Sequence, residues 1–462
     1  MLKPNLKSVA NEIKLKLPKK GSFVFNVLIL MTGSSIAQVI PVAISPILTR
    51  VYTPENFGIF AFFLSITGIL SVIVTGRYGL AIKLPEKDEE SVNLLILSIL
   101  IACGISLIVL IIVFIFNNQI TKLLSTREVS RWLYFIPFAI LLAGTYQALN
   151  CWSIRKKQFK SVSFSKVSQS TTRAATSLSL GLLKFGSAGL IIGNFVGQLT
   201  ATLILGWQAW KNDKDKMKFV LKEETKKVAK KYKNFPKYST WSALLNTASV
   251  QVPILMLTPF FGSEVVGFYS LSHRVLTMPI SLLGQAVGQT FFQKASENKD
   301  DRKKLQYITF EVYKKLLYVG CFPILVITFF GKEIFSFIFG AQWVIAGNYA
   351  QILSIWILLV FISSPLSTLF IVLNKLRQGL IVDIILFSSR VIALLIGAIY
   401  FKDIEISIIL FGTVSAIVWL GLCLYILRLV DIRYSTSIFI LLKIIVISLL
   451  PLIVLRFVIG NI

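Results

Sequence analysis

Long apolar segments recur along the whole chain, and this recurrence most limits what it can fold into. A helix rises about 1.5 Å per residue, so roughly 20 apolar residues cross a hydrocarbon core about 30 Å thick. With 55% hydrophobic and only 15% charged residues, the 462-residue chain has too little polar surface for soluble domains. Regular long runs, rather than short alternating segments, also exclude an outer-membrane barrel. Thirteen runs predict membrane-spanning helices, near 23–48, 57–76, 92–116, 133–151, 162–183, 187–210, 238–260, 266–292, 311–330, 349–373, 379–400, 405–427 and 437–459.

Positive charge is distributed unevenly between the connections. The chain has 48 Lys and Arg against 21 Asp and Glu, and its net charge of +27 would suggest nucleic acid in a soluble protein. Successive connections between the predicted helices lie on alternate sides of the membrane. The connections on one side hold 36 of the Lys and Arg residues, those on the other side hold 8, and the other four lie inside the predicted helices. Because short basic loops resist translocation, the N-terminus and the lysine-rich segment 211–237 are predicted to be cytoplasmic. We expect a multi-pass membrane protein with no cleavable signal peptide.

Two stretches 209 residues apart share the pattern E-x-x-G-apolar-aromatic-small. They begin at Glu55 and Glu264, and the predicted helix before each carries two prolines. A period of six helices leaves both halves in the same orientation. The sequence therefore predicts an all-α integral membrane protein with two six-helix lobes in pseudo-two-fold arrangement around a central cavity. The expected parts are a basic amphipathic N-terminus (1–22), an N-lobe (23–210), a basic cytoplasmic linker (211–237), a C-lobe (238–427) and an accessory C-terminal span (428–462).

Residues suited to catalysis are sparse. The chain has no G-x-x-x-x-G-K-[ST] phosphate loop, one histidine and four scattered cysteines. These features argue against ATP hydrolysis and against a metal-dependent or triad enzyme. Asp213-Lys214-Asp215 has the D-x-D form of some glycosyltransferases, but it stands alone among lysines. We therefore expect that the protein is not an enzyme and that it binds no cofactor or metal. A polysaccharide polymerase or ligase remains an alternative, although the outer connections are short for such an enzyme.

Arginines in or at the ends of the predicted helices are the candidate substrate-binding residues. An arginine at the bilayer centre costs about 2.5–3.5 kcal/mol, so it normally faces a partner or a water-filled cavity. Guanidinium groups bind diphosphate in a bidentate fork and stay charged, so unpaired arginines suit an anionic substrate. For Arg390 the structural alternative is a brace with Asp383, two turns earlier on the same helix. The candidates are Arg50, Arg77, Arg173, Arg274 and Arg390.

Two polar stripes accompany these arginines. The fifth predicted helix carries nine Ser and Thr residues between 163 and 179, and Gln285, Gln289 and Gln293 recur at every fourth position of the eighth. Both stripes suit hydrogen bonds to sugars, and interhelical hydrogen bonding is an equally good account of each.

Several blocks of the sequence resemble polysaccharide flippases of the O-antigen and capsule type. The blocks are 47–58, 75–85, 151–160, 267–284 and 291–296. The resemblance implies the multidrug/oligosaccharidyl-lipid/polysaccharide exporter fold and a lipid-diphosphate-linked oligosaccharide as cargo. Related flippases carry cavity arginines on the first, second and eighth helices, where this chain offers Arg50, Arg77 and Arg274. They often have an acidic residue after the Arg-Tyr of the second helix, where this chain has Gly79.

The predicted function is a flippase that moves a polyprenyl-diphosphate-linked oligosaccharide from the cytoplasmic to the outer leaflet by alternating access. The resemblance also implies a location in the bacterial inner (plasma) membrane. A multidrug antiporter of the same fold is an alternative, but it would need deep acidic residues where the spans offer only Asp383. Coupling to an H+ or Na+ counter-ion has two in-span candidates, Asp383 and His273. The other expected partners are membrane lipids and the polysaccharide polymerase machinery, with no nucleic acid, and the protein is expected to be a monomer.

Overall fold

The computed structural model describes residues 23–124 and 127–460, and every regular element in these ranges is helical. The expected N-terminal amphipathic segment 1–22 lies outside the described residues. In chain order the elements are α2 (Phe23–Ala43), α3 (Ser45–Val51), α4 (Pro54–Ile73), α5 (Tyr78–Ala81), α6 (Asp88–Leu124), α7 (Arg127–Leu133), α8 (Ile136–Arg155), α9 (Phe159–Leu182), α10 (Ser187–Met217), α11 (Lys222–Lys231), η1 (Phe235–Ser239), α12 (Thr240–Pro279), η2 (Ile280–Gly284), α13 (Gln285–Glu297), α14 (Arg302–Phe339), η3 (Ala341–Trp343), α15 (Val344–Leu366), α16 (Leu369–Val372), α17 (Leu376–Leu395), η4 (Ile396–Phe401), α18 (Ile404–Arg428) and α19 (Tyr434–Gly460).

Eleven helical segments in the described residues are long and apolar enough to cross a membrane. The thirteen expected runs reduce to this number for two reasons. The seventh and eighth runs are the two arms of α12, which is counted once, and the hydroxyl-rich α9 is too polar to reach the same hydropathy. Since α9 packs between α2 and α10, its polar side chains meet other helices rather than lipid.

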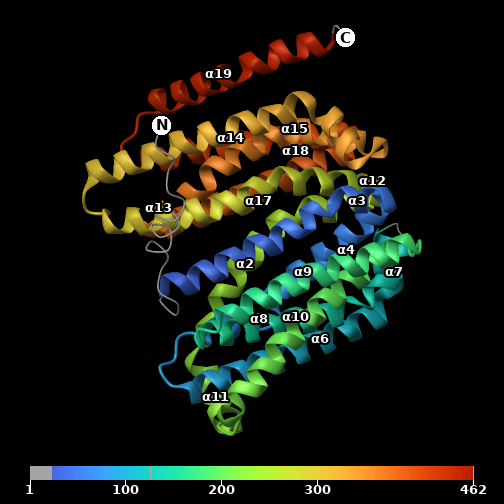
Figure 1. Ribbon diagram of the computed structural model, residues 1–462, viewed down its shortest axis with the longest axis vertical. Helices are drawn as coiled ribbons and strands as arrows, with labels where there is room; N and C mark the ends of the chain where they lie inside the picture. Colours follow the sequence, from blue (N-terminus) through green and yellow to red (C-terminus); the bar gives the residue numbers. More distant parts are fainter. Residues whose placement is uncertain (1–22, 125–126, 461–462) are drawn as a thin grey trace, which may run out of the picture.

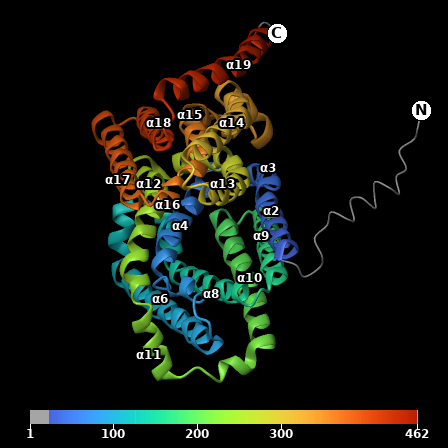
Figure 2. The same cartoon turned by 90° about the vertical axis from the view of Figure 1, so that its left-hand side faces the viewer.

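The helices form two groups stacked along the longest axis of the molecule (Figures 1 and 2). We call the group α2–α10 the N-lobe and the group α12–α18 the C-lobe. Helix α19 follows the C-lobe at the outer edge of the stack, where it packs mainly on α14 (Figure 1). The fold is thus the predicted all-α membrane architecture with two lobes and an additional C-terminal helix. We call the end of the molecule where α11 and α13 lie the basic end, and we call the end where α3 and α7 lie the opposite end.

Helix α12 is a hairpin of two helices joined at Gly262. This glycine has a φ of 85° and a ψ of 173°, a conformation that L side chains rarely adopt. The two arms lie side by side, because Val250 of the first and His273 of the second line the same cavity. The hairpin therefore corresponds to the seventh and eighth predicted helices, and its second arm carries the repeat that begins at Glu264.

The two copies of the repeat pack against each other at the opposite end. A Cβ atom on Gly58 would lie 1.6 Å from the carbonyl oxygen of Ser263, and one on Gly267 would lie 1.8 Å from that of Pro54. Ser263 and Gly267 follow Pro54 and Gly58 by the same 209 residues, so the contact is reciprocal. Reciprocal contacts between equivalent surfaces are the mark of a two-fold relation.

The lysine-rich segment between the lobes is docked on the N-lobe. Helix α10 continues to Met217, and α11 packs against α6. The side chain of Asn93 donates to the carbonyl of Phe219 at 2.9 Å, and its oxygen accepts from Thr225 at 2.8 Å. Tyr78 donates to the carbonyl of Ala229 at 3.0 Å. The lysines are therefore presented from a folded surface at the basic end.

Candidate functional site

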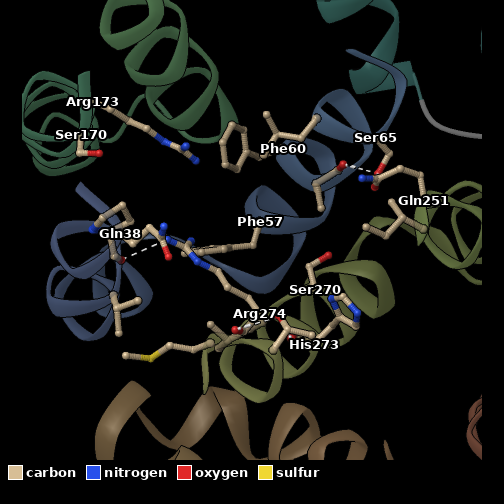
Figure 3. Close-up of a pocket in the computed structure, with 18 of the residues that line it drawn as sticks. Gln38, Phe57, Phe60, Ser65, Ser170, Arg173, Gln251, Ser270, His273 and Arg274 are labelled. Carbon is tan, nitrogen blue, oxygen red and sulfur yellow. Dashed lines mark hydrogen bonds between the residues drawn. The ribbon is translucent and has the colours of Figure 1, made fainter. Parts of the chain in front are cut away.

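A cavity of about 620 Å³ lies between the two lobes, within the size range of small-molecule sites. Its walls come from α2, α4 and α9 of the N-lobe and from both arms of α12 (Figure 3). The described residues that line it include two arginines and no carboxylate. The lining residues are Ala37, Gln38, Pro41, Val42, Phe57, Phe60, Ala61, Leu64, Ser65, Gln169, Ser170, Arg173, Gln251, Ile254, Ser270, Leu271, His273, Arg274, Thr277 and Met278.

Arg173 enters the cavity from α9 (Figure 3). Its guanidinium carbon lies 5.2 Å from the ring centre of Phe60, a cation–π distance. Within the described part of the chain this guanidinium forms no hydrogen bond or ion pair with another protein group. Two close approaches by glycines hold α9 against α10, because a Cβ on Gly193 or Gly197 would clash with the Arg173 turn. The arginine is thus presented from a rigid helix pair with its donors unused.

Arg274 enters the same cavity from the second arm of α12 (Figure 3). Its Nη2 donates to the carbonyl of Pro41 at 3.1 Å, a hydrogen bond that joins the lobes. The chain breaks between α2 and α3 at Ile44, just before Pro46, which has no N–H to continue the helix. The break leaves the Pro41 carbonyl to accept from Arg274. Arg173 and Arg274 also line one smaller hollow beside the cavity, so the two guanidinium groups converge.

Amide and hydroxyl groups supply the remaining polar surface of the cavity. The Ser65 hydroxyl and the Gln251 side chain meet at 2.9 Å, which links α4 to the first arm of α12. Ser170 donates to the carbonyl of Ala37 at 2.7 Å, and Gln38 stands on the same helix, α2. Sugars offer hydroxyl groups that both donate and accept, and neutral amides suit them.

The hydroxyl stripe of α9 divides between the two predicted roles. Ser163 donates to the carbonyl of Ile29 at 2.9 Å, so it joins α9 to α2. Ser165 donates within its own helix, and Ser170 both joins α2 and lines the cavity. Interhelical hydrogen bonding thus accounts for two hydroxyls of this stripe, Ser163 and Ser170.

A second cavity of about 700 Å³ continues from the first into the C-lobe. His273 and Thr277 line both, so the two spaces meet along one face of α12. Gln289 lines the second cavity, whereas Gln293 donates to Glu297 at 2.9 Å on the exposed surface. The side chain of Gln285 lies outside what the structure describes. Of the predicted glutamine stripe, Gln289 is thus the member placed in a cavity.

Arg390 is 6% exposed and lies in the C-lobe behind the cavity wall. Its Nη1 donates to the Ser249 hydroxyl at 3.1 Å, and its guanidinium stacks 5.1 Å from the centre of the Trp356 ring. The Trp356 ring in turn lies 5.8 Å from His273, which faces the cavity. Asp383, half-buried on α17, forms no ion pair with Arg390 and lines neither cavity.

Arg50 and Arg77 are not brought to the cavity. Arg50 is exposed in the last turn of α3 at the opposite end. Arg77 follows α4 with a left-handed φ of 60° and lies near Cys151, toward the basic end. The structure thus brings together Arg173, Arg274 and His273 of the sequence-predicted residues.

The cavity is closed toward the opposite end by contacts between α3 and the C-lobe. Trp343 Nε1 and Gln342 Nε2 both donate to the carbonyl of Thr49, at 2.9 and 2.6 Å. The Trp343 ring meets Phe57 and Phe268 edge to face, with centres 5.1 and 5.9 Å apart. Together with the glycine contacts, this layer seals that side of the cavity.

Sequence reasoning missed the neutral side chains of the cavity. Gln38 and Gln251 are amides within apolar runs, and the rule that singled out the arginines would have drawn attention to them. Ser65, Phe57 and Phe60 carry no comparable signal, because hydroxyl and aromatic residues are common in any transmembrane helix.

Two lobes of membrane-spanning helices around a central cavity define a class of membrane transporters. Among solved structures, the lipid II flippase MurJ in an inward closed conformation matches with a TM-score of 0.61 and 14% identity, over 92% of this chain and 98% of that one. An inward-facing multidrug resistance MATE family transporter of the MOP superfamily also matches with a TM-score of 0.61 and 14% identity, over 88% and 94%. At this identity the likeness concerns the fold.

The chain belongs to the family described as "Polysaccharide biosynthesis protein", which it matches over residues 47–347. The predicted family resemblance is thereby confirmed. The succinoglycan biosynthesis transport protein ExoT of Rhizobium meliloti (strain 1021) is 24% identical over 338 residues, 72% of this chain and 65% of the relative. The teichuronic acid biosynthesis protein TuaB of Bacillus subtilis (strain 168) is 23% identical over 137 residues, 29% and 28% of the two chains. The chain thus spans less than two thirds of these curated relatives.

Proposed function

We propose that the protein is a flippase that carries a polyprenyl-diphosphate-linked oligosaccharide from the cytoplasmic to the outer leaflet of the bacterial plasma membrane. The observation that carries the proposal is the convergence of Arg173 and Arg274, from opposite lobes, on one cavity that has no carboxylate in its lining. Buried cations without a counter-charge favour an anionic ligand, and paired guanidinium groups suit a diphosphate. The relatives are described as a succinoglycan biosynthesis transport protein and a teichuronic acid biosynthesis protein, which supports a polysaccharide precursor as the cargo.

The arginines bind the diphosphate and the neutral groups bind the sugars. Within the described residues, the N–H groups of the Arg173 guanidinium are free to donate, and Arg274 donates one hydrogen bond to the Pro41 carbonyl. Gln251 and Ser65 line the same cavity, with Gln38 on the facing helix, and so lie within reach of sugars linked to the diphosphate. The polyprenyl chain stays in the lipid. Arg390 supports the wall through Trp356 and His273 and adds positive potential behind it.

The basic end faces the cytoplasm in this proposal, because 36 of the bases lie in the connections assigned to that side. Contacts at the opposite end close the outer side, so the described conformation gives the cargo access from within. Rocking of the lobes then exchanges access, and cargo binding favours whichever state places the two arginines better around the diphosphate. His273, at the junction of both cavities, is the better placed of the two counter-ion candidates, because Asp383 lines neither.

The arginine mechanism is tested by binding and transport with purified full-length protein. In nanodiscs, farnesyl diphosphate serves as a short polyprenyl diphosphate probe, and its affinity is measured for Arg173→Gln and Arg274→Gln. Each change removes a charge-assisted contact worth roughly 1.5–3 kcal/mol, so a loss of about 10- to 100-fold is expected. Arg173→Lys and Arg274→Lys keep the positive charge but lose the bidentate hydrogen bonds of the guanidinium. Their affinities should lie between those of the wild type and the Gln variants.

Arg377→Gln is the matched control, because Arg377 is exposed and lines neither cavity. Flipping of a fluorescent polyprenyl-diphosphate-linked oligosaccharide in proteoliposomes gives the second readout. Wild-type affinity and flipping rate in the Arg173→Gln/Arg274→Gln double variant would show the arginine mechanism to be wrong. A preference of the wild type for a cationic drug over farnesyl diphosphate would instead favour the multidrug antiporter.

A further inference from the structure

A second cluster of positive charge lies outside the central cavity, around the basic turn that follows α8. Arg155, Lys156 and Lys157 belong to one of the sequence blocks that resemble other family members, yet they line neither cavity between the lobes. With Lys83 and Asp88 they line a separate hollow of about 420 Å³ at the basic end. The hollow thus joins the α8–α9 turn to the connection between α5 and α6.

A partly buried network of ion pairs holds two of these cations in place. Asp88 accepts from Lys156 at 2.7 Å and from Arg155 at 3.3 Å. Lys156 also lies 3.6 Å from Asp213, which is 6% exposed and accepts from Trp152 Nε1 at 3.0 Å. Burial alone would lower the pKa of Lys156, but the hydrogen bond to Asp88 and the charges of Asp213 and Asp88 outweigh it and raise that pKa above its usual value. Its ammonium group therefore stays charged.

Backbone carbonyls also hold the guanidinium of Arg155 in place. It donates to the carbonyls of Pro85 and Glu86 in addition to Asp88. The α8–α9 turn, the α5–α6 connection and the end of α10 are thereby tied into one unit. Rigid cations around a hollow bind an anion with little loss of side-chain freedom.

The other two cations of the hollow do not take part in this network. Lys83 and Lys157 are exposed, and neither forms an ion pair with a carboxylate in the described residues. Lys83 lies beside the buried thiol of Cys151, and Lys157 has a left-handed φ of 56°. Four cations against one carboxylate leave the hollow strongly positive.

Two exposed leucines lie close to Lys83 in the sequence. Leu80 is 41% exposed and Leu84 is 59% exposed, although Ala81 and Ile82 between them are fully buried. The hollow also lies where the apolar segment of α6 begins, at Asp88, and that of α8 ends, at Arg155. The ends of membrane-spanning segments are where lipid headgroups are expected. A leucine surface next to a cationic hollow matches a molecule that has both an acyl chain and a phosphate.

We infer that this hollow is a binding site for the headgroup phosphate of an anionic phospholipid of the adjacent leaflet. Lys83 and Lys157 contact the phosphate oxygens, Arg155 and Lys156 supply fixed charge behind them, and Leu80 and Leu84 contact the first part of the acyl chains. Basic pockets at the ends of transmembrane helices recognise anionic headgroups in this way. The site is independent of the cargo cavity, and it anchors the N-lobe to the headgroup layer.

Native mass spectrometry of the full-length protein, titrated with phosphatidylglycerol in detergent, tests the site. Lys83→Gln/Lys157→Gln should weaken phosphatidylglycerol binding on the order of tenfold, as expected when two lysines near a headgroup are neutralised. Lys83→Arg/Lys157→Arg should bind nearly as well as the wild type. The matched control is Lys226→Gln/Lys230→Gln on α11 at the same end. It removes two exposed lysines that form no ion pair within the described residues and should change the affinity less than twofold.

Leu84→Gln separates a lipid from a free phosphate. It should weaken binding of phosphatidylglycerol and leave binding of inorganic pyrophosphate unchanged. Unchanged phosphatidylglycerol affinity in Lys83→Gln/Lys157→Gln would overturn the site. A different result would assign the site to a soluble phosphate instead of a lipid. In that case pyrophosphate would bind at least as tightly as phosphatidylglycerol, the lysine double variant would lose pyrophosphate binding, and Leu84→Gln would leave it unchanged. Farnesyl diphosphate binding at the cargo cavity should stay at the wild-type level throughout, so this site and the proposed function can fail separately.

Discussion

Gly58 and Gly267 occupy equivalent places in the two repeats, and each lies directly against the backbone of the other repeat. A Cβ on Gly58 would lie 1.6 Å from the Ser263 carbonyl, and one on Gly267 would lie 1.8 Å from the Pro54 carbonyl. No side chain fits at either place unless α4 and α12 separate. The pair therefore sets how closely the two lobes approach at the end opposite to the lysine-rich segment.

Gly58→Ala is expected to open this end of the molecule. The added methyl group must displace a backbone carbonyl, and such overpacking costs about 1–3 kcal/mol. In a variant without the four native cysteines, Ser270→Cys in the cavity reports the opening by its labelling rate in intact cells with a bulky, membrane-impermeant maleimide, which reaches the protein only from outside. The rate should rise about tenfold in Gly58→Ala, and similarly in Gly267→Ala.

Gly68→Ala provides the control for this experiment on the same helix. A Cβ at Gly68 would lie 3.7 Å from the nearest neighbouring atom, Nε2 of Gln251, which is an ordinary contact. Its labelling rate should match that of the parent protein. Equal rates in Gly58→Ala and Gly68→Ala would mean that the glycine contact does not control closure.

Pro46→Ala should uncouple cargo binding from movement of α2. An alanine restores a backbone N–H, so the chain can continue as one helix and the Ser45 N–H can bond to the Pro41 carbonyl. Arg274 then loses its acceptor on the N-lobe but remains in the cavity. We expect farnesyl diphosphate affinity within twofold of the wild type and a flipping rate reduced several-fold. A parallel fall in both quantities would show that the helix break shapes the binding site itself.

Asp213→Asn should destabilise the N-lobe, whereas Asp215→Asn should not. Asp213 is buried and accepts from Trp152 while it lies near Lys156, but the side chain of Asp215 is 90% exposed and pairs with Lys218 alone. Weakening the buried network should lower the free energy of unfolding by about 1–3 kcal/mol, against less than about 0.5 kcal/mol at the surface. Thermal unfolding of both variants in one detergent measures the difference, and equal stabilities would contradict the assigned role.

Trp343→Phe tests the hydrogen bond that closes the opposite end. The change removes the donor to the Thr49 carbonyl and keeps an aromatic ring against Phe57. The closed state should lose about 0.5–1.5 kcal/mol, seen as faster labelling of Ser270→Cys. Trp356→Phe is the reference, because Trp356 Nε1 is buried and donates to no acceptor in the described residues. Faster labelling in Trp356→Phe than in Trp343→Phe would argue against the proposed closure.

Much of the fold was readable in the sequence because the bilayer constrains it so strongly. A run of about twenty apolar residues has few other stable conformations, so the helices, the repeat that begins at Glu55 and Glu264 and the family membership could all be predicted. The α12 hairpin was expected as two spans, and the non-helical backbone at Gly262 separates its two arms. The polarity of α9 was visible too, but its packing between α2 and α10 was not.

The sequence by itself determined that this chain is a two-lobed helical membrane protein with unpaired arginines in its spans, because hydropathy and charge are local properties of a segment. The tertiary structure alone decided that Arg173 and Arg274 share one cavity, that Arg390 lies behind its wall, and that Arg50 and Arg77 lie elsewhere. Which way a side chain points depends on the rotation and tilt of its helix. These are set by contacts such as Gly58 with Ser263 and Arg274 with Pro41, between residues about 200 positions apart.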